Sequence, residues 1–184
     1  KYVDLYSKSQ LLRNRNLYRN KFYGNRMFTN FVFQKYKIFD EIESYSDSIN
    51  EDSIKKLRIH WNSGIGNYSY FGRILDKLYE KFRIKKFLHL PTKKRIYLDK
   101  KKIDLFYNMN VFYSRRTVAW FRKNALQNLN LEIPERIGTF KYFNQLRQSR
   151  VSLSPFGWGE INYRDFESFI CCSLLLKPNM SHLE

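Results

Sequence analysis

Short apolar runs alternate with amphipathic stretches in the C-terminal half of the chain, and this order constrains the fold more than any other feature. Strand-like runs occupy residues 103–107, 151–154 and 174–177. Helical spacing of apolar side chains covers residues 115–129, 140–149 and 160–172. Short hydrophobic strands separated by helices are typical of a parallel sheet covered on both faces. The sequence therefore predicts an α/β fold.

The N-terminal half repeats this order once. A strand-like run at residues 57–61 precedes a turn with Gly64 and Gly66, and residues 68–82 have the spacing of an amphipathic helix. Residues 1–35 are expected to be helical, and the acidic, serine-rich stretch 40–53 is expected to form an exposed loop or linker. We therefore predict two Rossmann-like lobes with parallel sheets, 1–100 and 101–184, joined by the basic stretch 83–102. The chain begins with Lys1, and we expect it to be a piece of a longer, truncated fold.

Composition excludes several classes of protein. With 43% hydrophobic and 18% aromatic residues, the chain can bury a core, so disorder of the whole chain is excluded. Its apolar runs are far shorter than the ~20 residues that cross a bilayer, and no signal peptide is recognisable. The two cysteines, Cys171 and Cys172, are adjacent, which suits neither a disulfide nor a metal site. We expect a cytoplasmic location.

The net charge of +17, from 34 Lys and Arg against 17 Asp and Glu, predicts a polyanionic partner. Nucleic acid, acidic lipid and nucleotide phosphates all satisfy this requirement. Aromatic residues interleaved with Lys and Arg, as in YRNKFYGNRMF at residues 18–28, are typical of proteins that bind single-stranded nucleic acid. A nucleic-acid-binding protein without catalysis therefore stays open as an alternative to an enzyme.

The stretch SPFGWGEINYRDFESF, residues 154–169, carries the most unusual chemistry. Its two glycines allow the backbone to approach a ligand closely, and a helix starting near Glu160 would offer its N–H groups to a phosphate. On that helix Glu160 and Glu167 would share one face, with Arg164 between them. Such a pair could bind hydroxyl groups at two ends of a nucleotide sugar. The same three residues could equally be an ion-pair ladder on a helix surface.

Residues 142–184 resemble the donor-binding half of bacterial GT-B glycosyltransferases, and more narrowly the family 1 or exostosin-like group of surface-polysaccharide synthesis. That group has a Ser-Pro-x-Gly-Trp-Gly turn, a helix with Arg-x-x-Glu, and a strand ending in Lys-Pro-x-Met-Ser-His. The positions are filled here by Ser154, Gly157, Trp158, Gly159, Arg164, Glu167 and His182. Residues 115–126 resemble the basic helix start of the donor domain, and residues 59–75 resemble an acceptor-domain strand and glycine turn.

The resemblance implies transfer of a sugar from a nucleoside-diphosphate sugar to a saccharide or lipid-linked acceptor, without a metal or cofactor. It implies that Glu167 binds the ribose and that Glu160, as a catalytic residue, binds the donor sugar or the segment next to it. The diphosphate leaving group would be stabilised by the amides of Gly157 and Gly159 and by Arg115 or Arg116. Retaining GT-B enzymes commonly space their two glutamates eight residues apart, whereas the interval here is seven.

Several other residues have both a functional and a structural interpretation. His60 and His182 could each act as a general base or contact phosphate, or each could be a satisfied structural group. Gly64 and Gly66 could admit the acceptor or the pyrophosphate, and Trp158 could stack on a base or a sugar. As an enzyme of this class, the protein would act at the inner face of the cytoplasmic membrane, in contact with anionic lipid.

Overall fold

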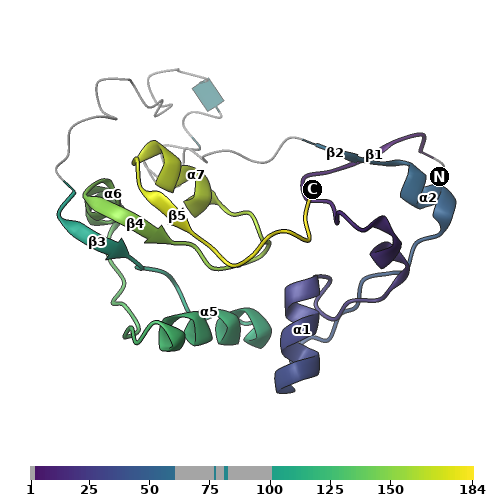
Figure 1. Cartoon of the computed structure of the whole chain (residues 1–184), viewed down its shortest axis with the longest axis horizontal. Helices are drawn as coiled ribbons and strands as arrows, with labels where there is room; N and C mark the ends of the chain where they lie inside the picture. Colours follow the sequence, from purple (N-terminus) through teal and green to yellow (C-terminus); the bar gives the residue numbers. More distant parts are fainter. Residues whose placement is uncertain (1–2, 61–76, 78–80, 83–100) are drawn as a thin grey trace.

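The chain contains two small parallel sheets at opposite ends of its long axis (Figure 1). The computed structural model describes residues 3–60, 77, 81–82 and 101–184. The N-terminal sheet pairs β1 (Tyr6–Lys8) with β2 (Leu57–Ile59). The C-terminal sheet has the order β3 (Ile103–Phe106), β4 (Ser149–Leu153) and β5 (Leu174–Leu176). The predicted α/β class with parallel sheets is therefore confirmed.

The helices described are the 3-10 helix η1 (Arg15–Arg19) and the α-helices α1 (Met27–Tyr36), α2 (Glu51–Lys55), α5 (Arg116–Asn128), α6 (Thr139–Arg147) and α7 (Tyr163–Ile170). The helices predicted at 115–129 and 140–149 are confirmed with small shifts at their ends. Residues 1–35 are only partly helical, because β1 lies within them and α1 begins at Met27. The predicted turn at 62–67 lies outside the described residues, as do nearly all of the 68–82 helix and most of the basic stretch. None of the described helices is long and apolar enough to cross a bilayer.

Neighbouring side chains of β3 point to opposite faces of the C-terminal sheet and bury two different clusters. Phe106 packs with Phe143 and Leu146 of α6 and with Cys171 at the end of α7. Leu105 packs on the cluster that contains Leu126 of α5. Helices α6 and α7 therefore cover one face and α5 the other, as the alternation of strands and helices predicts.

The β5 strand departs from this expectation. It pairs with β4 only, and Leu174 is 73% exposed while Leu176 is 41% exposed. The sequence predicts an apolar strand covered on both faces, but within the described part of the chain β5 is a partly exposed edge strand. A run of three leucines does not by itself distinguish a central strand from an edge strand, since position in the sheet depends on distant segments.

Lys101 joins the carboxyl ends of two helices. Its Nζ donates to the carbonyl oxygens of Arg147, at the end of α6, and of Cys171, which caps α7, both at 2.8 Å. A cation at a helix C-terminus interacts favourably with the helix dipole and satisfies carbonyls that have no partner within the helix.

Replacing Lys101 with alanine is expected to lower the free energy of unfolding by about 1–3 kcal/mol, because two charge-assisted hydrogen bonds are lost. The neighbouring Lys102 is exposed, so Lys102→Ala is the matched control and should change stability by less than about 0.5 kcal/mol. Urea unfolding followed by circular dichroism measures both. Equal effects of the two substitutions would contradict this role for Lys101.

The acidic stretch at residues 40–53 is not simply an exposed loop. Asp40 is buried, and its Oδ1 accepts hydrogen bonds from the backbone N–H and the hydroxyl of Thr117 at 2.7 and 2.9 Å. Arg115, the N-cap residue of α5, makes no side-chain hydrogen bond to the start of the helix. Asp40, 77 residues earlier in the sequence, instead accepts the hydrogen bond of a backbone N–H in the first turn. The Arg115 Nε lies 3.5 Å from Asp40 Oδ2. The expectation of an exposed loop therefore fails at Asp40.

The C-terminal segment returns to the N-terminal part of the chain. Leu183 forms an antiparallel bridge with Leu12, and the Arg13 N–H donates to the His182 carbonyl at 2.9 Å. Figure 1 shows this end of the chain beside β1 and β2. The N-terminal sheet and the loop after β4 are thereby held near each other.

Candidate functional site

Helix α7 begins three residues later than the sequence predicts. Its N-cap is Asn162, which forms a capping box with Asp165: each side chain accepts a hydrogen bond from backbone at the start of the helix. Glu160 therefore lies in the loop before α7 and not on the helix. The predicted placement of Glu160 and Glu167 on one helical face is wrong, because the capping box fixes the start of α7 at Tyr163.

Asp165 also connects the ends of two strands. It accepts a hydrogen bond from the Ser154 hydroxyl at 2.6 Å and forms an ion pair with Lys177 at 2.9 Å, and all three side chains are largely buried. Burial lowers the pKa of Lys177, while the hydrogen bond from Lys177 to Asp165 acts in the opposite direction. Ser154, predicted to form part of a donor-binding turn, here fixes the loop after β4 to α7.

The two glycines of the loop are closely approached by protein side chains. A Cβ atom at Gly157 would lie 2.6 Å from an Arg122 guanidinium nitrogen, and one at Gly159 would lie 3.2 Å from Gln10. The Gly157 N–H, predicted to contact a diphosphate, donates to the Gly159 carbonyl at 3.0 Å. Neither glycine has a positive φ. The sequence predicts that a ligand approaches the backbone closely at these glycines. In the structure the side chains of Arg122 and Gln10 occupy those positions.

Two of the three arginines predicted to bind the donor, Arg164 and Arg115, form hydrogen bonds with backbone carbonyls of distant segments. Arg164 donates to the carbonyls of Leu153 at 3.3 Å and Asn108 at 2.5 Å, so it ties together the ends of β3 and β4. Arg115 donates to the Gly24 carbonyl at 2.7 Å in addition to its contact with Asp40. Arg116 is exposed, and its nearest acidic partner is Glu41 at 3.8 Å.

Glu167 is buried beside Tyr142, whose hydroxyl donates to its carboxylate at 2.7 Å. Burial raises the pKa of Tyr142 above its usual value, nearby Arg164 acts in the opposite direction, and the negative charge of Glu167 raises it further. The predicted contact of Glu167 with a ribose stays a prediction, since its carboxylate here has a protein donor.

Replacing Tyr142 with phenylalanine is expected to lower the free energy of unfolding by about 1–3 kcal/mol near neutral pH, because the buried Glu167 carboxylate loses a hydrogen bond. The raised pKa means that Tyr142 contributes stability that is fully present below the ordinary tyrosine pKa of about 10 and is lost as the pH rises above it. The stability difference between wild type and Tyr142→Phe should therefore narrow in alkaline solution. Denaturant titrations across this range measure the difference, and a constant or widening difference would count against the assignment.

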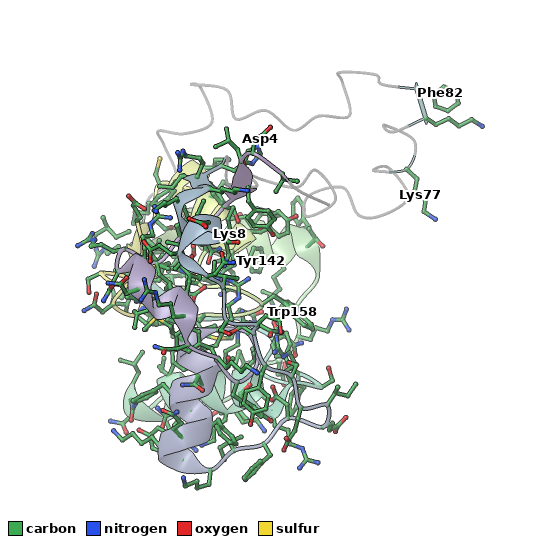
Figure 2. All side chains as sticks on the ribbon, turned by 90° about the vertical axis from the view of Figure 1, so that its right-hand side faces the viewer. Asp4, Lys8, Lys77, Phe82, Tyr142 and Trp158 are labelled. Carbon is green, nitrogen blue, oxygen red and sulfur yellow. The ribbon has the colours of Figure 1, made fainter. Side chains whose placement is uncertain are left out.

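A pocket of about 570 Å³ lies between the N-terminal segments and the loop after β4. Its wall includes residues of β1, η1 and the segments 20–27 and 46–57, together with Glu160 and Leu183. The cationic side chains in the wall are Lys8, Arg26 and Lys56, and the aromatic ones are Tyr6, Tyr18 and Phe22. Figure 2 views the molecule from the end that carries β1 and β2, and it labels Lys8.

Glu160 is the most deeply buried charged group in this wall, with only 2% of the residue exposed. Its Oε2 lies 3.3 Å from Nη1 of Arg26, its Oε1 lies 3.8 Å from Nε2 of His182, and its backbone N–H donates to Gln10 at 3.3 Å. Burial lowers the pKa of Lys8, Arg26 lowers it further, and Glu160 acts in the opposite direction. The wall thus combines one buried carboxylate with cations that can contact an anion.

The other predicted site residues lie outside this wall. Trp158 is 64% exposed, with its ring 6.5 Å from that of Tyr113 and next to the Arg115 guanidinium. His60 is exposed at the end of β2, where its N–H donates to the Lys8 carbonyl at 2.9 Å. Gly64 and Gly66 lie outside the described residues. Among the predicted donor-binding and catalytic residues that the structure describes, only Glu160 lines the pocket.

Sequence reasoning did not identify Arg26, Lys8 or Gln10. Arg26 belongs to the basic and aromatic stretch 18–28, but nothing local indicates that it pairs with a carboxylate 134 residues away. In the part of the chain that the structure describes, no group of three or more His, Cys, Asp or Glu residues is arranged to hold a metal ion.

Comparison with known proteins adds no assignment. No protein-family description matches the chain, and no curated protein or solved structure matches it. The motifs of the chain and the geometry of the pocket are therefore the observations that bear on its function.

Proposed function

We propose that the chain binds a nucleoside-diphosphate sugar in the Glu160 pocket and transfers the sugar to a saccharide or lipid-linked acceptor. The observation that carries this proposal is the buried Glu160 carboxylate in a wall that also contains Arg26 and Lys8. A pocket of about 570 Å³ is within the usual size range for small-molecule sites. The resemblance of residues 142–184 to GT-B glycosyltransferases supports the same class of reaction.

Each part of such a ligand has a suitable partner in the wall. Arg26, Lys8 and Lys56 offer positive charge to the diphosphate, and arginine in particular can bind phosphate through two parallel hydrogen bonds. The rings of Tyr18 and Phe22 offer apolar faces for the base. Glu160 can accept hydrogen bonds from hydroxyl groups of the sugar.

The chemistry follows from this arrangement of charge. As the oxygen of the acceptor hydroxyl bonds to the anomeric carbon, the bond from that carbon to the diphosphate oxygen breaks and negative charge develops on the leaving group, which takes up the proton that the hydroxyl gives up. Arg26 and Lys8 stabilise that negative charge, and Glu160 stabilises the positive charge that develops on the sugar. No metal is needed for these two contributions.

We also propose that residues 1–100 and 101–184 belong to two lobes of a GT-B fold. Each range contains one of the parallel sheets. The pocket lies between segments of the first range and Glu160 and Leu183 of the second, which is where a ligand bound between two lobes would lie.

Calorimetric titration with nucleoside diphosphates and nucleoside-diphosphate sugars tests the proposal. We expect saturable binding that Arg26→Ser weakens about tenfold or more, because a charge-assisted hydrogen bond is lost. Arg150 is exposed on β4 outside the pocket, so Arg150→Ser is the matched control and should bind as wild type does. Thermal unfolding of each variant confirms that it is folded.

The net charge of +17 also favours a second candidate, a nucleic-acid-binding protein without catalysis. In that case the same titrations would show no saturable nucleotide binding. Single-stranded RNA would instead bind with strong salt dependence and without preference for a nucleotide.

A further inference from the structure

Trp158 is the one exposed residue in an otherwise buried loop (Figure 2). Residues 152–160 are all buried except Trp158, which is 64% exposed. The Gly157 N–H donates to the Gly159 carbonyl at 3.0 Å, so a tight turn carries the tryptophan at its tip. Phe156, just before the turn, packs in a buried hydrophobic cluster. The loop therefore presents a large aromatic ring to solvent from a well-packed base.

The neighbours of the Trp158 ring fix its position and leave much of it open. Its centroid lies 6.5 Å from that of Tyr113, with the two rings at 76°, and the Arg115 guanidinium lies 5.8 Å from the Trp158 centroid. Tyr113 is partly exposed, and the Arg122 guanidinium lies 4.9 Å from its centroid. We call the rings of Trp158 and Tyr113 the aromatic platform. A ligand that stacks on rings already held in place loses less free energy to ordering them.

The two arginines beside the aromatic platform are directed at oxygen atoms of the protein. Arg115 donates to the Gly24 carbonyl at 2.7 Å, and its Nε lies 3.5 Å from the Asp40 carboxylate. Arg122 donates to two backbone carbonyls, each at 3.0 Å. A site for single-stranded nucleic acid combines stacking rings with cations that contact the phosphates. Here the cations next to the rings have protein partners, so the platform suits an uncharged ligand with an apolar face.

We propose that the aromatic platform binds an uncharged saccharide, and that this saccharide is the acceptor of the transfer. The C–H groups on one face of a pyranose ring form an apolar surface that packs on the negative face of an aromatic ring. Trp158 is two residues from Glu160, so their Cα atoms are at most about 7 Å apart. A saccharide on the platform therefore lies close to the loop that carries Glu160. Its role as the acceptor rests on the proposed function, whereas its binding to the platform does not.

The aromatic platform is separate from the Glu160 pocket. The resemblance to glycosyltransferases implies that Trp158 belongs to the donor-binding turn, but neither Trp158 nor Tyr113 lines the pocket. Arg115 and Arg122 do not line it either. Saccharide binding and nucleotide binding are therefore separate properties, and each can be measured without the other.

Calorimetric titration of the 184-residue chain with neutral hexasaccharides tests the inference. The probes are cellohexaose, mannohexaose and chitohexaose. We expect the wild type to bind at least one of them, Trp158→Ala to weaken that binding about tenfold or more, and Trp158→Phe to keep part of it because a ring remains. Phe140→Ala, which removes an 82% exposed ring on α6, is the matched control and should bind as wild type does. Thermal unfolding checks that each variant is folded.

The dependence on salt and on the nucleotide distinguishes the alternatives. Raising the NaCl concentration from about 50 mM to about 0.5 M should change the saccharide affinity less than about twofold, because no ion pair with the ligand is formed. Trp158→Ala should leave the affinity for a nucleoside diphosphate unchanged, so that a failure of the proposed function is distinguishable from a failure of this inference.

Four results would overturn the inference. The first is that the wild type binds none of the three hexasaccharides, and the second is an equal loss of binding in Phe140→Ala. The third is salt-sensitive binding of single-stranded RNA that depends on Trp158. The fourth is that Trp158→Ala weakens nucleoside-diphosphate binding as much as saccharide binding, which would assign the ring to the donor.

Discussion

Asp40→Ala is expected to lower the free energy of unfolding by about 3–5 kcal/mol, which would unfold a large fraction of a marginally stable protein. The substitution removes the acceptor of the Thr117 backbone N–H and hydroxyl, and it leaves the Arg115 guanidinium without its carboxylate. It also removes one of the contacts that join the 40–45 segment to the start of α5.

The control for this prediction is Asp52→Ala. The Asp52 side chain is 86% exposed and its partner Lys55 is exposed too, so its removal should change stability by less than about 0.5 kcal/mol. Thr117→Val separates the two donors, because it removes the hydroxyl and keeps the backbone N–H. Denaturant unfolding is the measurement. If Asp40→Ala and Asp52→Ala have similar effects, Asp40 does not hold the start of α5.

Asp165→Ala is expected to have an effect of similar size, about 3–5 kcal/mol, for a different reason. Its carboxylate is the partner of the buried Lys177 ammonium and the acceptor of the Ser154 hydroxyl, and it belongs to the capping box of α7. The substitution therefore leaves a buried positive charge without a partner and removes a cap at the same time.

A second substitution distinguishes these two contributions. Lys177→Met removes the unpaired charge and keeps most of the volume, so the double variant Asp165→Ala/Lys177→Met should regain a large part of the lost stability, while the capping loss of about 1 kcal/mol remains. Thermal and denaturant unfolding of the single and double variants give the interaction energy between Asp165 and Lys177. Strictly additive effects would show that the ion pair does not account for the loss.

The sequence predicts most of the strands and helices because their signals are local. Apolar side chains spaced three and four residues apart identify α5 and α6, and the apolar run at 103–107 contains β3. The start of α7 was predictable too. Asn162 followed by Asp165 is a capping pattern, and giving it priority over the glycine turn would have placed Glu160 outside the helix.

The contacts that form the site could not be predicted in the same way. Arg26 meets Glu160 across 134 residues, and Asp40 caps α5 across 77 residues. No periodic pattern encodes such pairs, since they depend on how the segments pack. The acidic stretch around Asp40 resembled an exposed loop because one buried carboxylate among exposed ones changes neither composition nor spacing.

The sequence identified Glu160 for a geometric reason that the structure does not support, since Glu160 and Glu167 do not share a helical face. Glu160 is nevertheless the member of the predicted set that lines the pocket, because the loop after β4 turns toward the N-terminal segments before α7 starts. Gln10, which accepts the Glu160 N–H, holds the loop in that position.

If the Glu160 carboxylate binds the sugar of a nucleoside-diphosphate sugar, as proposed, its neutralisation should affect the sugar conjugate more than the nucleoside diphosphate alone. The most direct test is calorimetric titration of wild type and Glu160→Gln with one nucleoside diphosphate and with its sugar conjugate. We predict that the variant binds the nucleoside diphosphate at least as tightly, because a negative charge near the phosphates is gone, and binds the conjugate about tenfold more weakly. An equal change for both ligands, or no binding of either by wild type, would contradict the claim.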